Sequence, residues 1–191
     1  MNDTSSGYLC SALGTPLTQD ELLHREGLMQ HVDQQVAVGI DGLLVGGSMG
    51  MMQLLKDDTY HDLVRLCVSY CKRRAELFVG VGDTSFYRTR ERIRFVNDFE
   101  VDGILLLAPY FVPFSQTLLV EYFESLAEES RAPLYLYDIP QRTGVSLSLE
   151  SIMQLAAHPK IVGIKCSGDL TEARRLCELM AGTDFRVVKT L

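Results

Sequence analysis

A lysine and a tyrosine stand at the ends of two short apolar runs and could together support covalent chemistry. Lys165 follows the run Ile161–Ile164, and it is the one lysine of five that ends an apolar run within the motif G-I-K-x-S-G-D. Burial there would disfavour the charged ammonium, and a neutral amine can attack a ketone or aldehyde to form a Schiff base. Tyr137 closes the run Leu134–Tyr137, and its phenol could shuttle the protons that imine formation requires. The residue types also allow simpler roles, namely a lysine that reaches solvent and an aromatic ring that fills space.

Two other segments could bind the carboxylate of a substrate. The turn Gly46–Gly50 offers flexible backbone N–H groups and the hydroxyl of Ser48. Arg142 lies in the loop directly after the tyrosine and carries a guanidinium fork that matches a carboxylate. Glycine-rich turns and solvated arginines are common, so each feature alone is a weak indication.

Seven apolar runs of four to six residues punctuate the chain, and they are continuous rather than alternating. Such runs are typical of parallel strands that are covered on both faces. The predicted strands are Tyr8–Leu13, Gly42–Val45, Leu77–Val81, Gly103–Leu107, Leu134–Tyr137, Ile161–Ile164 and Phe185–Val188. The predicted helices are 21–38, 84–96, 116–130 and 149–157. We expect the segment 84–96 to be a basic amphipathic helix with a solvated outer face, and Ser148 to cap the helix that starts at Leu149.

This alternation of strands and helices fits either a doubly wound open sheet or a closed (β/α)8 barrel, both of the α/β class. No G-x-G-x-x-G motif follows the first strand, which disfavours a dinucleotide-binding sheet. The segment Gly39–Val45 is similar to Glu100–Leu106, which supports a repeated strand–helix plan. No proline- or serine-rich linker divides the chain, so we expect residues 1–191 to form a single domain.

The composition excludes several classes of protein. The 191 residues carry a formal net charge of −7, which gives nucleic acid no electrostatic footprint. The longest uncharged apolar stretch, Gly103–Val112, is about half a membrane span, and the polar start of the chain does not resemble a signal peptide. Five cysteines and four histidines form no zinc-binding pattern, so we expect free core thiols and no metal site. These features predict a cytoplasmic protein without nucleic-acid or membrane partners.

Four motifs occur in the order that one known family shows. They are G-x-x-G after the second predicted strand, A-P-Y after the fourth, Y-D-I-P-x-R-T-G after the fifth and G-I-K-x-S-G-D after the sixth. Together they resemble the dihydrodipicolinate synthase / N-acetylneuraminate lyase family over about residues 7 to 188. The resemblance implies a TIM (β/α)8 barrel that acts as a pyruvate-dependent class I aldolase or lyase. Its chemistry would pass through a lysine imine, without a metal or an organic cofactor.

The resemblance also implies roles for individual residues. Lys165 would form the Schiff base with pyruvate, and Tyr137 would donate and accept the protons. Ser48 takes the place of the family's relay threonine. Together with Gly47 and Met49, it would bind the pyruvate carboxylate, mainly through backbone N–H groups.

Other positions bear on the second substrate. Arg142 lies in the R-T-G segment typical of the synthase branch, where that arginine grips the carboxylate of the aldehyde, so the resemblance favours 4-hydroxy-tetrahydrodipicolinate synthase and lysine biosynthesis. Met49 and Met51 replace a threonine and a glutamate of the family pattern. Phe111 stands where the synthases have the tyrosine that completes the proton relay across a dimer interface. These changes leave open another acceptor, as in N-acetylneuraminate lyases or in the sugar-acid aldolases and dehydratases of the family.

The chain stops at its seventh predicted strand, whereas the family continues into an eighth strand and a helical tail. We therefore expect a C-terminally truncated barrel that lacks the eighth strand–helix unit and the C-terminal helices. A catalytically inactive truncated barrel is a further possibility. The full-length form is expected to be a homo-oligomer, either a dimer or a tetramer, and to act on pyruvate and an aldehyde.

Overall fold

The computed structural model describes residues 8–189. The chain divides into two compact units, one ending at Gly80 and the other beginning at Val81. The polar first seven residues, together with Thr190 and Leu191 of the expected 1–191 domain, lie outside the described residues. Within each unit all paired strands are parallel, as the continuous apolar runs predict.

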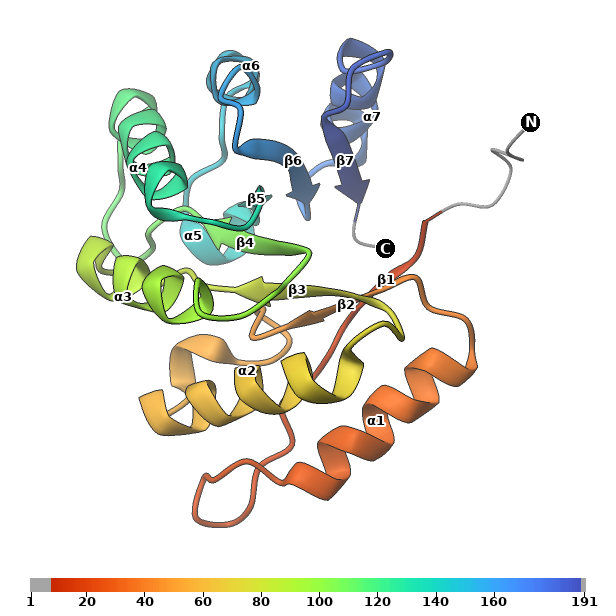
Figure 1. Cartoon of the computed structure of the whole chain (residues 1–191). Coiled ribbons are helices and arrows are strands. Elements are labelled where there is room, and N and C mark those ends of the chain that lie inside the picture. The colour runs from red at the N-terminus through yellow and green to blue at the C-terminus, as the bar shows by residue number, and fades with distance from the viewer. Residues whose placement is uncertain (1–7, 190–191) are drawn as a thin grey trace. The chain divides into compact units, whose positions relative to one another are not determined.

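The first unit contains, in chain order, β1 (Cys10–Ala12), α1 (Arg25–Ala37), β2 (Gly42–Val45), a short 3₁₀ helix (Met52–Leu54), α2 (Asp57–Cys71) and β3 (Glu76–Gly80). β2 lies between β1 and β3, and its Gly42 is paired with Cys10 on one side and Glu76 on the other. Both helices lie on the same side of these strands (Figure 1). Every residue of β2 is buried, which explains its unbroken apolar sequence.

α1 begins four residues later than its sequence pattern predicts. Leu17 and Leu23 form an isolated antiparallel bridge, and Glu21 has a positive φ of 62°, so the first part of the predicted helix is a turn. His24 then caps the helix, because its Nδ1 accepts a hydrogen bond from the N–H of Gly27. Apolar spacing therefore identifies this helix but not its first residue.

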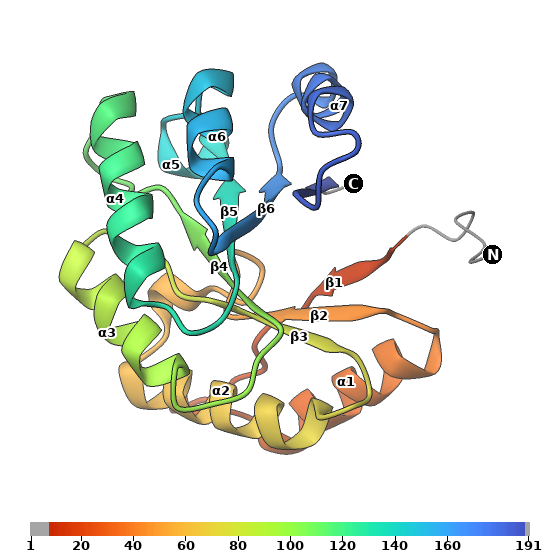
Figure 2. The ribbon, with the colours of Figure 1, turned by 45° about the horizontal axis from the view of Figure 1, so that its top comes forward.

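The second unit contains α3 (Phe86–Val96), β4 (Gly103–Leu107), α4 (Gln116–Glu129), β5 (Leu134–Asp138), α5 (Pro140–Thr143), α6 (Leu149–Ala156), β6 (Ile161–Cys166), α7 (Leu170–Leu179) and β7 (Arg186–Lys189). Its strands pair in chain order, β4 with β5, β5 with β6 and β6 with β7. α4 packs against α3 and α6, and α7 packs against β7. Figure 2 shows α4, α6 and α7 in a row along one side of this unit.

All seven predicted strands are present, with ends that shift by at most two residues. The predicted cap of α6 is also confirmed, since the Ser148 hydroxyl accepts a hydrogen bond from the N–H of Ser151. In both units short strands alternate with helices, and all strands except β1 and β7 are mainly buried, which is the local order of a (β/α) barrel.

α3 has the solvated outer face that its basic amphipathic sequence predicts, with Tyr87, Arg88, Glu91 and Arg94 exposed, but one of its basic residues faces inwards. Its Arg92 is buried and pairs with the buried Asp83, at 3.3 Å between Nη2 and Oδ2. Arg88 binds the same carboxylate at 2.7 Å. Burial alone would raise the pKa of Asp83, but the hydrogen bond from Arg88 and the charge of Arg92 lower that pKa overall. The buried carboxylate explains why a basic residue of α3 faces inwards.

Candidate active site

Lys165 and Tyr137 lie side by side on neighbouring parallel strands. They are direct partners in the register of β5 and β6. The Lys165 Nζ lies over the Tyr137 ring, 3.8 Å from its centroid, and donates a 3.3 Å hydrogen bond to the hydroxyl of Ser167. The ring is buried and the lysine is half-buried. The structure thus brings the Lys165 amine into contact with the ring of Tyr137.

Ser167 is a neighbour of the lysine that sequence reasoning missed. Its N–H donates a 2.8 Å hydrogen bond to the backbone oxygen of Asp138, so the turn after β6 is tied to the end of β5. The available signal was its place two residues after Lys165 in the same motif. The tie holds the hydroxyl where it accepts a hydrogen bond from the amine.

A second lysine lies at a strand end, although outside the four motifs. β7 ends at Lys189, one residue beyond the predicted strand, and its Nζ donates a 2.6 Å hydrogen bond to the backbone oxygen of Gly168. The register pairs Lys189 with Cys166, whereas Lys165 pairs with Val188. Because successive residues of a strand point to opposite faces, the two lysines project from opposite faces of the sheet.

Arg142 lies in α5, the short helix that follows β5, and its side chain is exposed. α5 ends at Gly144, whose φ of 73° lies in the left-handed region that favours glycine. The buried Thr143 stabilises this turn, since its hydroxyl donates a 2.8 Å hydrogen bond to the backbone oxygen of Val145. Arg142 is therefore presented to solvent on a compact, internally bonded loop.

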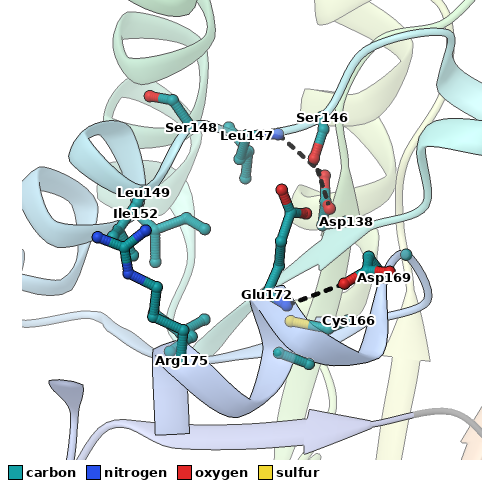
Figure 3. A pocket seen from close by; sticks show the side chains of 13 residues that line it. Asp138, Ser146, Leu147, Ser148, Leu149, Ile152, Cys166, Asp169, Glu172 and Arg175 are labelled. Carbon is teal, nitrogen blue, oxygen red and sulfur yellow. Dashed lines mark hydrogen bonds between the residues drawn. The ribbon is translucent and has the colours of Figure 1, made fainter. Parts of the chain in front are cut away.

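A cavity of about 230 Å³ lies beside this loop and is lined in part by Asp138, Cys166 and Glu172 (Figure 3). Asp138 and Cys166 each follow a residue of the lysine–tyrosine pair, so their side chains point to the opposite face of the sheet. Burial raises the pKa of the Asp138 carboxyl, although hydrogen bonds from Leu147 and Ser146 favour its charged form. Burial also raises the pKa of the Cys166 thiol to about 11, which keeps it protonated and unreactive near neutral pH.

The glycine-rich turn after β2 belongs to the first unit. Gly46 has a φ of 60°, and a Cβ at Gly80 would collide with the backbone oxygen of Gly46, so the close approach of these two segments needs glycine. Ser48 is half-buried. Met49 is 66% exposed, and Met51 has a left-handed φ of 50°. The turn thus carries backbone groups and one hydroxyl, with exposed thioethers where the family pattern has polar side chains.

Phe111 lies in the loop after β4 and is 95% exposed. Its φ of 85° is rare for an aromatic residue and must be held by the surrounding loop. Next to it, Tyr110 is half-buried, and burial raises the pKa of its phenol. The expected site residues fall into both units: Lys165, Tyr137, Arg142 and Phe111 in the second, and Gly47, Ser48 and Met49 in the first.

Within residues 8–189, no three His, Cys, Asp or Glu side chains are grouped so that they could hold a metal ion. Among the helices in this range, none combines the length and the apolar character that a membrane span needs. All five cysteines fall in the described part of the chain and have free thiols. Cys67, Cys71 and Cys166 are buried as expected, but Cys10 is half-buried and Cys177 is exposed, so the core role predicted for all five is wrong for these two.

The sequence profile of the dihydrodipicolinate synthetase family matches residues 5–187. The chain is 32% identical over 171 residues to a 4-hydroxy-tetrahydrodipicolinate synthase of Anaplasma marginale, covering 90% of this chain and 56% of that protein. It is 34% identical to a second such synthase, from Streptomyces coelicolor, covering 89% of this chain and 57% of that protein.

A solved structure of such a synthase is also similar to this chain in its fold. The dihydrodipicolinate synthase of Acinetobacter baumannii, complexed with pyruvate, superposes with a TM-score of 0.89 at 27% identity, over 95% of this chain and 62% of that one. The chain thus spans less than two thirds of the length of these proteins. It belongs to the dihydrodipicolinate synthetase family and has that family's α/β fold of the (β/α)8-barrel type.

Proposed function

We propose that this chain carries the imine-forming centre of a lyase or synthase that joins pyruvate to an aldehyde, in the manner of 4-hydroxy-tetrahydrodipicolinate synthase. The observation that carries the proposal is the Lys165 amine at a strand end, over the ring of Tyr137 and bonded to Ser167. The names of the relatives and the pyruvate in the Acinetobacter structure support the same substrate.

The chemistry follows from an amine in that place. The Lys165 nitrogen adds to the ketone carbon of pyruvate, the former carbonyl oxygen takes up protons and leaves as water, and a C=N bond remains. Loss of a proton from the methyl carbon gives an enamine, whose carbon attacks the aldehyde and forms the new C–C bond while the aldehyde oxygen gains a proton. Water then hydrolyses the imine and restores the amine. Tyr137 is the proposed donor and acceptor of these protons, because its ring contacts the lysine.

The remaining parts of the proposed site bind carboxylates. Backbone N–H groups of Gly47, Ser48 and Met49 are proposed to hold the pyruvate carboxylate, and the Ser48 hydroxyl to join the proton relay. Arg142, exposed on its loop, is proposed to bind the carboxylate of the aldehyde. This requires both units to form one barrel domain.

The same proposal extends to the setting of the whole protein. It would need no metal or organic cofactor, because the lysine itself activates the ketone. We place it in the cytoplasm as a homo-oligomer that serves lysine biosynthesis.

Borohydride reduction in the presence of pyruvate tests the proposal. Intact-mass spectrometry should show a gain equal to pyruvate less one oxygen atom, and peptide mapping should place it on Lys165. Lys165→Ala should abolish the adduct. Lys189→Ala is the matched control, since Lys189 also ends a strand but projects from the opposite face, and it should retain the adduct. An adduct that persists in Lys165→Ala would contradict the proposal, and so would a wild-type chain that forms none.

A second candidate keeps the imine and changes the acceptor to a sugar aldehyde or an amino sugar, as in the sugar-acid aldolases, dehydratases and N-acetylneuraminate lyases of the family. Three observations favour it: Met49 and Met51 supply no side-chain hydrogen-bond donor to the first-unit turn, and Phe111 lacks the relay hydroxyl. Turnover of the pyruvate adduct with aspartate semialdehyde, and then with sugar aldehydes, distinguishes the two. An adduct that no aldehyde consumes would indicate a chain that forms the imine but does not complete the reaction.

A further inference from the structure

We infer that Asp138 is a positioning residue for the aldehyde substrate: its carboxylate fastens the loop 139–148, and thereby Arg142. The inference rests on the proposed function, since it gives Arg142 the carboxylate of the aldehyde to bind. Asp138 itself belongs to the opposite face of the sheet from Tyr137 and Lys165, so it acts through the loop rather than on the reacting atoms.

Both oxygens of this carboxylate bind the far end of the loop that starts at the next residue. The hydroxyl of Ser146 donates to Oδ2 at 3.0 Å, and the N–H of Leu147 donates to Oδ1 at 3.0 Å. Figure 3 shows the two bonds converging on the side chain from the same segment. One side chain therefore joins the start of the loop to its end, and the segment between them cannot swing away without breaking both bonds.

The loop is bonded internally, so hydrogen bonds that hold its two ends also fix α5. Thr143 Oγ1 bonds the backbone oxygens of Ile139 and Val145, and Gly144 turns the chain with a left-handed φ. The loop therefore moves as a body, and the position of Arg142 depends on how its ends are held.

Three further hydrogen bonds tie the loop to the strands and to α4. The backbone oxygen of Asp138 accepts the N–H of Ser167, which also bonds the lysine, so Asp138 and the Lys165 amine share one rigid end of the sheet. Gln116 of α4 adds a tether, because its Nε2 donates to the backbone oxygen of Ser146 and its Oε1 accepts the N–H of Ser148. The hydrogen bonds to Asp138 thus set the distance from the imine to Arg142. A fixed distance selects aldehydes of matching length.

The surroundings of the Asp138 carboxylate explain why an acidic side chain stands at this position. Leu147 is buried, and an apolar residue at 138 would leave its N–H without an acceptor. Glu172, Cys166, Asp169 and Arg175 also line the cavity beside Asp138, but Asp169 caps α7 through the N–H groups of Thr171 and Glu172 rather than bonding the loop. Asp169 is therefore the matched control within the same cavity.

The test compares three variants of the full protein. Asp138→Ala should raise the KM for the carboxylated aldehyde by about tenfold or more, while the rate of pyruvate trapping by borohydride stays within about twofold, since the amine and its neighbours are untouched. Asp138→Asn should restore most of the affinity, because its amide oxygen still accepts from Leu147 and its NH₂ can donate to Ser146. Asp169→Ala should leave both quantities near wild type and should increase amide exchange only at the start of α7.

A double variant decides whether the effect passes through Arg142. In an Arg142→Ala background, Asp138→Ala should add no further increase in KM, because the group that it positions is gone. Additive effects would overturn the inference, as would an unchanged aldehyde KM in Asp138→Ala with normal pyruvate trapping. A wild-type protein without any pyruvate adduct would instead overturn the proposed function, so the two failures are distinguishable.

Discussion

The ends of β5 and β6 and the turn after β2 hold their polar groups in different ways. At the ends of β5 and β6, Lys165 is fixed by a ring and a hydroxyl, and Asp138 is fixed by two donors. In the turn after β2, the structure depends on glycine backbone, and the side chains at Met49 and Met51 are largely exposed. An imine needs one amine in one place, whereas a carboxylate can be bound by backbone N–H groups, which every sequence provides. If the chain forms the proposed imine, the turn can therefore bind the carboxylate without side-chain donors, whereas the lysine–tyrosine pair depends on its fixed geometry.

The two units also differ in their buried polar interactions. The second unit buries an ion pair between Asp83 and Arg92. In the first unit, the corresponding interactions are neutral: the Thr15 hydroxyl donates to the backbone oxygen of Gly50, and the Tyr60 hydroxyl donates to that of Gly80. A buried charge that loses its partner costs far more than a buried carbonyl that loses one donor. The second unit should therefore be the more sensitive to single polar substitutions.

The largest effect is expected from Asp83→Ala. It leaves the buried Arg92 without its carboxylate, and we expect the free energy of unfolding to fall by about 3 kcal/mol. Thr15→Val, the counterpart in the first unit, removes one neutral hydrogen bond and should cost about 1 kcal/mol. Urea unfolding followed by circular dichroism measures both. Equal losses of unfolding free energy in the two variants would mean that the two units are equally sensitive to polar substitutions.

The Asp83 effect should also depend on pH. Because the pKa of Asp83 in the folded state is lowered from its ordinary value of 3.8, the stability that it contributes is fully present above that value. It is lost as the pH falls through the lower, folded-state pKa. The difference between wild type and Asp83→Ala should therefore be constant near neutral pH and should shrink in acid below pH 3.8. A difference that grows in acid would contradict this assignment.

The sequence predicts the strands and the lysine–tyrosine pair well because both depend on local pattern. Continuous apolar runs identify buried parallel strands, and side chains near the ends of consecutive parallel strands lie side by side when they share a face of the sheet. What the sequence leaves undetermined depends on pairing between distant groups. Arg92 is buried because Asp83 lies opposite it, and Lys189 belongs to β7 because that strand continues to pair with Cys166.

For a related reason, the sequence does not predict the hydrogen bonds that Asp138 accepts from the loop. These bonds to Ser146 and Leu147 exist only because the loop returns to its own start, and that path depends on the left-handed turn at Gly144. The signal in the sequence was an acidic residue directly after Tyr137, on the alternate face, followed by a short loop with a glycine. Spacing alone does not say which loop N–H will meet the carboxylate.

The next largest effect is expected from Phe111→Tyr, which adds the hydroxyl that the relay of the synthases contains. If the proposed acceptor is right, turnover with aspartate semialdehyde should rise by about tenfold or more, the lower end of what acid–base groups contribute. Phe111 is 95% exposed, so the hydroxyl needs no buried partner and stability should not change. Phe111→Leu is the control and should give no rise. An unchanged rate in Phe111→Tyr would favour the second candidate, a sugar-acid aldolase or dehydratase.

The smallest effect is expected at Met49, where the turn after β2 can be given back one side-chain donor. Met49→Thr should lower the KM for pyruvate by about fivefold, the equivalent of one additional neutral hydrogen bond to the carboxylate. Met49→Val has the same shape as threonine without the hydroxyl, and both substitutions should be tolerated because the position is 66% exposed. Steady-state kinetics with pyruvate as the varied substrate separates them, and only the threonine variant should change KM. If the two variants have the same KM for pyruvate, the turn after β2 binds pyruvate through its backbone alone. The turn then differs more from the ends of β5 and β6, where side chains hold the polar groups, than the family pattern implies.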